Sequence, residues 1–185
     1  LVVTFPGICE MQARAIIEAA CEMKKKGVTA FPEIMIPLTT GEAEWEFNKE
    51  IVVRIADEVM QEQGIKVRYL VGTMIEIPRA CLRAGEIAES AEFFSFGTND
   101  LTQMTYGLSR DDAGRFLPEY IEKNLIARDP FVAIDREGVG EMVDIGIKRG
   151  KAVRENLEVG ICGEHGGEPS SVEFCHMVKM DYVSC

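Results

Sequence analysis

The sequence predicts an α/β fold, in which a parallel β-sheet is covered by helices, and two observations lead to this prediction. Short apolar runs of strand length alternate along the chain with longer segments whose apolar side chains recur at helical spacing. A helical stretch separates each strand-like run from the next, which is typical of βαβ units and not of hairpins. We therefore expect five parallel strands.

The first part of the chain contains two clear helices and one short strand. A surface helix is predicted over Glu10–Lys26, because its apolar residues recur at helical spacing and lysines occupy its last turn. A buried strand is centred on Ile34–Ile36, between two prolines. Thr40 is the expected cap of the second helix, Glu42–Gln63, which is apolar on one face and charged on the other.

The alternation then continues to the end of the chain, with one interruption. Residues 107–137 are less periodic and rich in charge and glycine, so we expect a long excursion at the active face with one short helix near Pro118–Leu125. The other predicted strands are Val67–Ile75, Glu92–Phe96, Leu157–Ile161 and Tyr182–Ser184, and the other predicted helices are Pro78–Ser90, one beginning near Asp100, Val139–Glu155 and Ser170–Lys179.

Parallel α/β proteins have two common stable forms, an open doubly wound sheet and a closed (β/α)8 barrel. The pattern of elements alone does not choose between them. A chain of 185 residues fits one domain, which we place over residues 1–185. Leu1 already belongs to an apolar stretch and Cys185 closes another, so we expect this domain to be incomplete at both ends.

Composition limits the classes of binding partner and the cellular compartment that we expect. The formal net charge of −11 argues against binding to nucleic acid or to anionic membranes, which requires clustered Lys and Arg. The sequence shows no signal-peptide pattern and no run of about 18 apolar residues, so we expect a cytoplasmic protein without a membrane segment, an organelle being equally compatible. The six cysteines lack the dense spacing of a secreted disulfide framework and are expected to be reduced.

Polar residues close three of the predicted strands, where a buried strand would not normally carry them. They are Glu76, the segment Gly97–Asp100 and the segment Cys162–Glu164. The carboxyl ends of parallel strands meet at one edge of the sheet, and the helix N-termini that follow favour anionic ligands. These residues are therefore the candidates for an active site.

Glu76 and Asp100 are candidate ligands for Mg²⁺, which takes hard oxygen donors and commonly one or two protein carboxylates. A chelating 2-oxo acid would complete such a site. The alternative is structural. Glu76 would then cap the helix that begins at Pro78, and Asp100 would cap or charge the start of the next helix. Spacing alone does not separate the two interpretations.

Cys162 precedes Gly163, so a ligand can approach the backbone closely and a thiol can exchange a proton with carbon there. A buried, inert cysteine is the alternative. His165 is an acid or base candidate as well, although the glycines after it indicate an exposed turn. A zinc site would have to combine Cys162 and His165 with Cys175 and His176. It is not favoured, because Cys175 and His176 are adjacent on a helix and point in different directions.

Three long motifs carry a family resemblance. The segments GTMIEIPR (72–79), FSFGTNDLTQ (94–103) and GICGEHGGEP (160–169) resemble the pyruvate, phosphate dikinases, and the similarity covers nearly the whole chain. The related phosphoenolpyruvate synthases share the shorter themes GTND and CGE. The resemblance implies a partial (β/α)8 TIM barrel, of which this chain supplies about the last five strands.

The resemblance also implies roles for the candidate residues. Glu76 and Asp100 match Mg²⁺ ligands, the segment Gly97, Thr98, Asn99 and Asp100 matches a substrate-binding segment, and Cys162 matches the general acid/base at the methyl carbon of pyruvate. The implied reaction transfers a phosphoryl group between a phosphohistidine and the pyruvate enolate. In the whole enzyme, ATP and phosphate are converted to AMP and pyrophosphate.

The implied partners are pyruvate or phosphoenolpyruvate, the phosphohistidine domain of the full-length enzyme and a second copy of the chain in a homodimer. The family's phosphate-binding arginines precede the point where this chain begins, so the fragment alone is expected to be inactive. A phosphoenolpyruvate synthase, which does not require inorganic phosphate, and a truncated barrel without catalytic activity are the alternatives.

Overall fold

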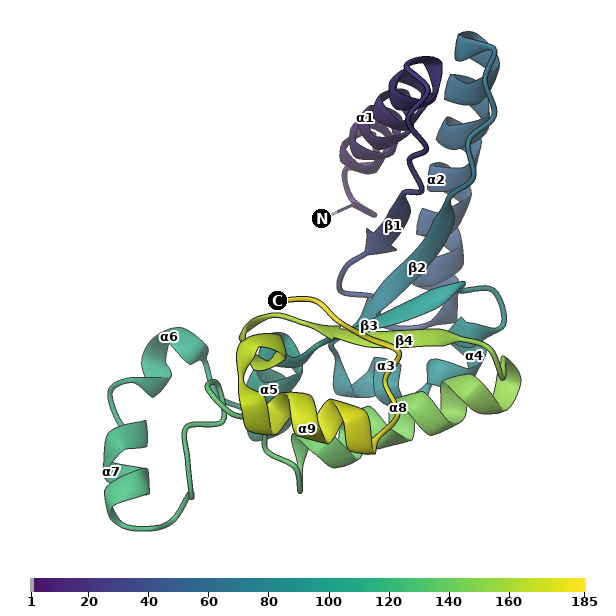
Figure 1. Ribbon diagram of the computed structural model, residues 1–185. Helices are drawn as coiled ribbons and strands as arrows, with labels where there is room; N and C mark the ends of the chain where they lie inside the picture. The colour runs from purple at the N-terminus through teal and green to yellow at the C-terminus, as the bar shows by residue number, and fades with distance from the viewer. Residues whose placement is uncertain (1) are drawn as a thin grey trace.

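The computed structural model describes residues 2–185, and the predicted α/β class is confirmed. Within these residues a five-stranded parallel sheet has its strands in the order β1-β2-β3-β4-β5, the same as their order in the chain (Figure 1). The strands are β1 (Glu33–Ile36), β2 (Leu70–Ile75), β3 (Phe93–Gly97), β4 (Glu158–Cys162) and β5 (Tyr182–Val183).

Strand order bears on the choice between the two forms of α/β sheet. A doubly wound sheet reverses its strand order at a switch point, whereas a barrel adds each new strand beside the previous one. The five strands here follow the second pattern throughout the described residues. The sheet is thus consistent with a segment of a (β/α) barrel, although the closed barrel itself stays a prediction.

Helices connect successive strands, and most lie close to their predicted positions. The main differences have local causes. The predicted helix Pro78–Ser90 is broken at Arg83 (φ −111°, ψ 17°), and the long excursion contains two short helices instead of one. The helices are α1 (Pro6–Lys25), α2 (Glu42–Gln63), α3 (Pro78–Leu82), α4 (Ala84–Ala88), α5 (Thr98–Tyr106), α6 (Arg110–Ala113), α7 (Leu117–Glu122), α8 (Val139–Val153) and α9 (Pro169–Met177), with a 3₁₀ turn η1 (Glu164–Gly167).

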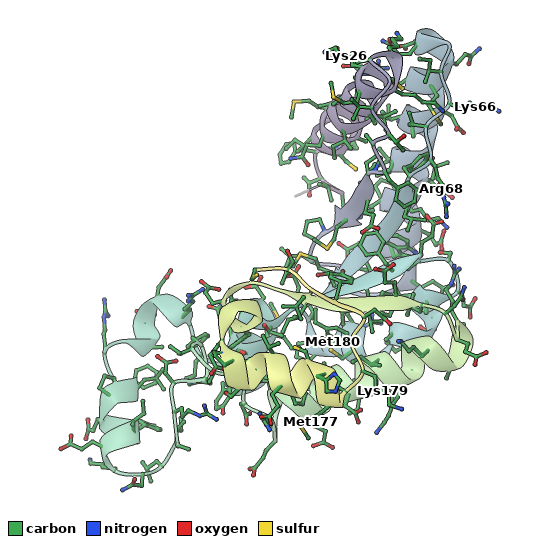
Figure 2. The ribbon with its side chains drawn as sticks, in the orientation of Figure 1. Lys26, Lys66, Arg68, Met177, Lys179 and Met180 are labelled. Carbon is green, nitrogen blue, oxygen red and sulfur yellow. The ribbon has the colours of Figure 1, made fainter. Side chains whose placement is uncertain are left out.

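Two helix boundaries differ from prediction for a visible reason. The cap of α2 is Gly41 and not Thr40, whose amide and hydroxyl instead donate to the Glu44 carboxylate at 2.9 and 2.6 Å. Helix α9 ends two residues before the predicted Lys179, because Lys179 has a left-handed backbone (φ 60°). Figure 2 shows this residue at the turn between α9 and β5.

One face of the sheet packs against α8. An added Cβ at Gly150 would lie 2.8 Å from the Phe94 ring, and one at Gly146 would lie 2.9 Å from the Phe96 ring, so these glycines let the helix backbone approach the aromatic side chains. Both phenylalanines are fully buried. Because side chains alternate along a strand, Ser95 and Gly97 lie on the opposite face, which leads to the candidate site.

Residues 107–137 form the predicted excursion, which extends away from the sheet with α6 and α7 (Figure 1). A small apolar cluster of its own contains Ala113, Leu117 and Phe131. The excursion returns to the body at α9, where the Arg136 guanidinium donates to the Ser170 carbonyl oxygen at 2.7 Å. The segment is therefore anchored to the body at its C-terminal end.

The N-terminal arm of the molecule consists of α1 packed against α2, with the buried side chains Ile17 and Val59 in the core. Lys26 and Lys66 lie toward the far end of this arm in Figure 2, where the Lys24 ammonium donates to the Lys66 carbonyl oxygen at 2.6 Å. Among the described residues, none of the helices combines the length and the apolar composition required to cross a bilayer.

Glu168 is the cap of α9, and its carboxylate accepts from the amides and the hydroxyls of Ser170 and Ser171 at 2.6–3.0 Å. These bonds, led by that from Ser171, lower the pKa of Glu168 to about 2. A carboxylate stabilises the fold only while it is ionised. Its contribution is therefore present above pH 4.5, its ordinary pKa, and is lost as the pH falls toward 2.

We predict that Glu168→Ala lowers the free energy of unfolding by about 1–2 kcal/mol, the usual cost of losing a helix cap. Glu173→Ala is the matched control, because Glu173 lies on the same helix and makes only an exposed ion pair with Arg136. Thermal unfolding of the complete protein between pH 3 and 7 would measure both variants. Equal stability of the two variants at pH 7 would contradict the prediction.

Candidate active site

The carboxyl ends of β2, β3 and β4 place the predicted residues side by side. Ile75 pairs with Phe96, and Gly97 pairs with Cys162. Glu76 follows Ile75 and therefore comes next to Gly97 on the same row. The strand register thus brings Glu76, Gly97 and Cys162 together at one edge of the sheet, as the sequence predicted.

Glu76 is a buried carboxylate that is held by a backbone amide. Glu76 is only 3% exposed, and its Oε1 accepts a hydrogen bond from the Leu38 amide at 2.6 Å. Burial and, to a smaller extent, the neighbouring Asp100 carboxyl raise the pKa of Glu76 to about 7, and the hydrogen bond from the Leu38 amide opposes this rise. The capping alternative for Glu76 is wrong, because Ile77 is the cap of α3 and no side chain bonds there.

Asp100 lies in the first turn of α5, so its charge also suits the positive end of that helix. Its Oδ1 accepts from the Gln103 side-chain amide at 2.9 Å. Neither Asp100 nor Glu76 forms an ion pair within residues 2–185. Two neighbouring carboxylates without a protein cation are a suitable environment for a divalent metal ion.

These two carboxylates are the part of the site that could hold Mg²⁺. In residues 2–185 no group of three or more His, Cys, Asp or Glu side chains lies close enough to hold a metal. Mg²⁺ typically takes one or two protein carboxylates and leaves its other positions to water and substrate, so the pair fits Mg²⁺. Zinc would require a fuller set of protein ligands, which is not found here.

Gly97 is required by the close approach of Glu76. An added Cβ at this position would lie 2.4 Å from Glu76 Oε2 and 2.8 Å from Glu76 Cβ. The carboxylate can move, but the Cβ is fixed by the β2 backbone. The absence of a side chain at Gly97 is therefore what allows Glu76 to lie across the end of β3.

Cys162 is half-buried and points its thiol at the end of β3, where Sγ donates to the Phe96 carbonyl oxygen at 3.8 Å. Burial raises the pKa of the thiol, the Ser95 hydroxyl opposes that rise, and the Glu76 carboxylate adds to it. The thiol is therefore protonated at neutral pH. A protonated, partly accessible thiol beside a carboxylate pair can deliver a proton to a bound ligand.

Sequence reasoning missed two residues beside Cys162, namely Ser95 and Tyr182. The Tyr182 ring covers Gly160, where an added Cβ would lie 2.4 Å from the ring, and its hydroxyl donates to the Phe94 carbonyl oxygen at 3.1 Å. Ser95 is a single hydroxyl within the strand FFSFG. That isolated polar residue in an apolar strand was the available signal, whereas Tyr182 looked like an ordinary strand residue.

Asn99 belongs to a polar network at the open side of the site. Its side-chain amide donates to the Glu164 carboxylate, which also accepts from Arg110 Nη2 at 2.6 Å. Hydrogen bonds from Arg110, the largest cause, and from Asn99 lower the pKa of Glu164 to about 2. Asn99 Oδ1 is buried and has no hydrogen-bond partner among residues 2–185. The sequence placed Asn99 and Glu164 among the polar strand ends but did not predict the contact of Glu164 with Arg110.

Thr98 and His165 are fully buried, and they contact each other. The distance from Thr98 Oγ1 to His165 Nδ1 is 2.6 Å. The exposure expected for His165 is therefore wrong, because its side chain is buried, although the turn itself is present as the 3₁₀ turn η1 and Gly163, Glu164 and Gly167 are exposed.

Comparison with known proteins places this chain in a family. The model of the family described as "PEP-utilising enzyme, PEP-binding domain" matches residues 1–185. Curated relatives include "Pyruvate, phosphate dikinase" of Clostridium symbiosum, which is 56% identical over 100% of this chain and 21% of its own length. "Pyruvate, phosphate dikinase 1, chloroplastic" of Arabidopsis thaliana is 54% identical over 99% of this chain and 19% of its own.

A third relative, "Pyruvate, phosphate dikinase" of Rhizobium meliloti, is 54% identical over the whole chain. The chain spans about a fifth of the length of these relatives (19–21%). The family model covers every residue, and the relatives are similar throughout. The chain therefore belongs to the PEP-binding domain family of PEP-utilising enzymes.

Proposed function

We propose that this chain forms the pyruvate and phosphoenolpyruvate site of a pyruvate, phosphate dikinase. The observation that carries the proposal is the row of Glu76, Gly97 and Cys162 at the carboxyl edge of the sheet, with Asp100 beside Glu76. The high similarity to relatives named pyruvate, phosphate dikinase supports it. The domain would interconvert pyruvate and phosphoenolpyruvate by exchanging a phosphoryl group with a phosphohistidine.

The complete enzyme would couple this exchange to ATP and phosphate, giving AMP and pyrophosphate. Its phosphohistidine domain would be the partner that visits this site, and a homodimer is proposed on the resemblance alone. Inorganic phosphate provides a direct test, because a phosphoenolpyruvate synthase does not need it. Turnover that depends on phosphate would support the dikinase, and turnover without phosphate would overturn it.

Glu76 and Asp100 would hold Mg²⁺ in this proposal. When bound, the ion would neutralise the charge that develops on the enolate and carboxylate oxygens of the ligand. Glu76 is suited to this role because its carboxylate is buried and held by the Leu38 amide. Asp100 is held by Gln103, so both carboxylates are oriented before a ligand arrives.

Cys162 would handle the proton at the methyl carbon. In the direction of pyruvate, the P–O bond of phosphoenolpyruvate breaks, the phosphoryl group goes to the unphosphorylated histidine of the partner domain, and the thiol proton goes to carbon three of the enolate, which leaves a thiolate. In the reverse direction, the Cys162 thiolate removes that proton. The burial that keeps the thiol protonated favours the role of proton donor.

The segment Gly97–Asp100 would bind the ligand through its backbone and through Asn99. The first amides of α5 have no acceptor within the helix, and they suit an anionic group. Asn99 reaches the open side of the site, whereas the Thr98 hydroxyl is occupied by His165. Thr98 would therefore contribute through its amide and not through its side chain.

The proposed metal site can be tested in the complete protein. Glu76→Ala and Asp100→Ala should each abolish Mg²⁺-dependent binding of oxalate, a stable mimic of the enolate, because one carboxylate is lost from a pair. Isothermal titration with and without Mg²⁺ measures the effect. Glu50→Ala and Asp57→Ala, at exposed positions of α2, are the matched controls and should bind as wild type. Retained binding in both site variants would disprove the assignment.

Cys162→Ser should stop the proton exchange while leaving ligand binding intact, because a serine hydroxyl is a far weaker acid than a thiol. The measurement is deuterium incorporation into the methyl group of pyruvate, and a loss of about 100-fold or more is expected. Cys9→Ser on α1 is the control for the chemical change. Wild-type exchange in Cys162→Ser would show that another group moves the proton.

Gly97→Ala should weaken oxalate binding and destabilise the fold by about 1–3 kcal/mol, because the added methyl group displaces Glu76. Gly114→Ala is the matched control, since nothing lies within 4 Å of its added Cβ and its φ is −58°. Oxalate titration and thermal unfolding of both variants check the prediction. Unchanged oxalate affinity in Gly97→Ala would mean that Glu76 is not needed where the structure places it.

A further inference from the structure

His165 occupies an unusual environment for a residue in a glycine-rich loop. It is 0% exposed, although it lies in the short turn η1 directly after β4. Both ring nitrogens have partners, because Nδ1 lies 2.6 Å from Thr98 Oγ1 and Nε2 lies 2.9 Å from the Pro130 carbonyl oxygen. The ring therefore connects three segments that are far apart in the sequence.

The partners determine which nitrogen carries the proton. A carbonyl oxygen can only accept, so His165 Nε2 must donate to Pro130. Burial lowers the pKa of His165, which keeps the ring neutral and leaves Nδ1 without a proton. Nδ1 then accepts from the Thr98 hydroxyl. Each of the two bonds thus has a fixed direction.

This arrangement excludes a direct catalytic role for His165. A general acid or base must reach the reacting atoms, and both nitrogens of this buried ring are already bonded to the protein. The ring can instead fix the positions of the residues to which it is hydrogen-bonded. Thr98 is the first residue of α5, between Gly97 and the pair Asn99 and Asp100.

We infer that His165 is a positioning residue whose two hydrogen bonds have separate effects, one on ligand affinity and one on the order of the excursion. The bond from Thr98 orients the start of α5, and with it the Asp100 carboxylate relative to Glu76. The bond to Pro130 anchors the returning part of the excursion, residues 126–134, against the loop that follows Cys162. The inference on affinity rests on the proposed function.

Two amide substitutions separate the bonds. In His165→Asn the side-chain oxygen takes the place of Nδ1 and accepts from Thr98, but the side chain is too short to reach Pro130. In His165→Gln the side-chain nitrogen takes the place of Nε2 and donates to Pro130, but no acceptor remains for Thr98. His176→Asn is the matched control, because His176 is exposed on α9.

The variants are made in the complete protein and measured in two ways. Oxalate binding in the presence of Mg²⁺ reports on the start of α5, and amide hydrogen exchange of residues 126–134 reports on the excursion. We expect His165→Gln to weaken oxalate binding about tenfold or more, because Thr98 loses its buried acceptor. The amide hydrogen exchange of residues 126–134 should stay near that of the wild type in this variant. His165→Asn should bind oxalate as wild type and exchange residues 126–134 faster.

A purely structural role would give a different pattern. If His165 only fills space, both variants should change affinity and exchange together, and that outcome would overturn the inference, as would wild-type behaviour of both. Thr98→Val provides a second route if a His165 variant does not fold. It should weaken oxalate binding as His165→Gln does, whereas Thr98→Ser, which keeps the hydroxyl, should restore it.

Failure of this inference differs from failure of the proposed function. If the wild-type protein shows no Mg²⁺-dependent binding of oxalate, the proposed function fails and the affinity half of the inference fails with it. The exchange of residues 126–134 still tests the Pro130 bond in that case. If the wild type binds oxalate but the crossed pattern is missing, His165 is not the positioning residue and the proposed function stands.

Discussion

The register of three parallel strands is the constraint on which the rest of the structure depends. It brings the ends of β2, β3 and β4 into one row, so that Glu76, Gly97 and Cys162 become neighbours. Gly97 makes this row possible, because any side chain there would occupy the space of Glu76. On the other face, Gly146 and Gly150 of α8 let the helix backbone approach β3. Strand β3 is therefore closely packed on both sides.

The loops at the carboxyl edge are held by polar contacts in addition to the apolar cluster of the excursion, and the contacts of His165 are buried. His165 joins η1 to the start of α5 and to the excursion, and Glu168 binds both serines at the start of α9. Arg136 attaches the excursion to the same helix. Burying a polar group without a hydrogen-bond partner costs free energy, so the paired contacts of His165 favour one loop arrangement over the alternatives. A site made from loops can in this way be oriented before its ligand binds.

Charge at the site follows from the same geometry. Glu76 and Asp100 are neighbours with no ion-pair partner in the described part of the chain, and burial raises the pKa of Glu76. Glu164, a short distance away, has Arg110 beside it and a lowered pKa. The pKa values of Glu76 and Glu164 thus shift in opposite directions, because Glu76 is buried next to a carboxylate and Glu164 is exposed next to a guanidinium.

The sequence by itself determined the alternation of helices and strands, the five strands and the candidates Glu76, Asp100 and Cys162, since periodicity and the polar ends of strands are local signals. Tertiary structure decided the rest. It buries His165, places the ring of Tyr182 over Gly160 and pairs Arg110 with Glu164. These contacts are made between residues that are distant in the chain. No local pattern encodes such contacts, because they exist only after strand register and helix packing have brought the segments together.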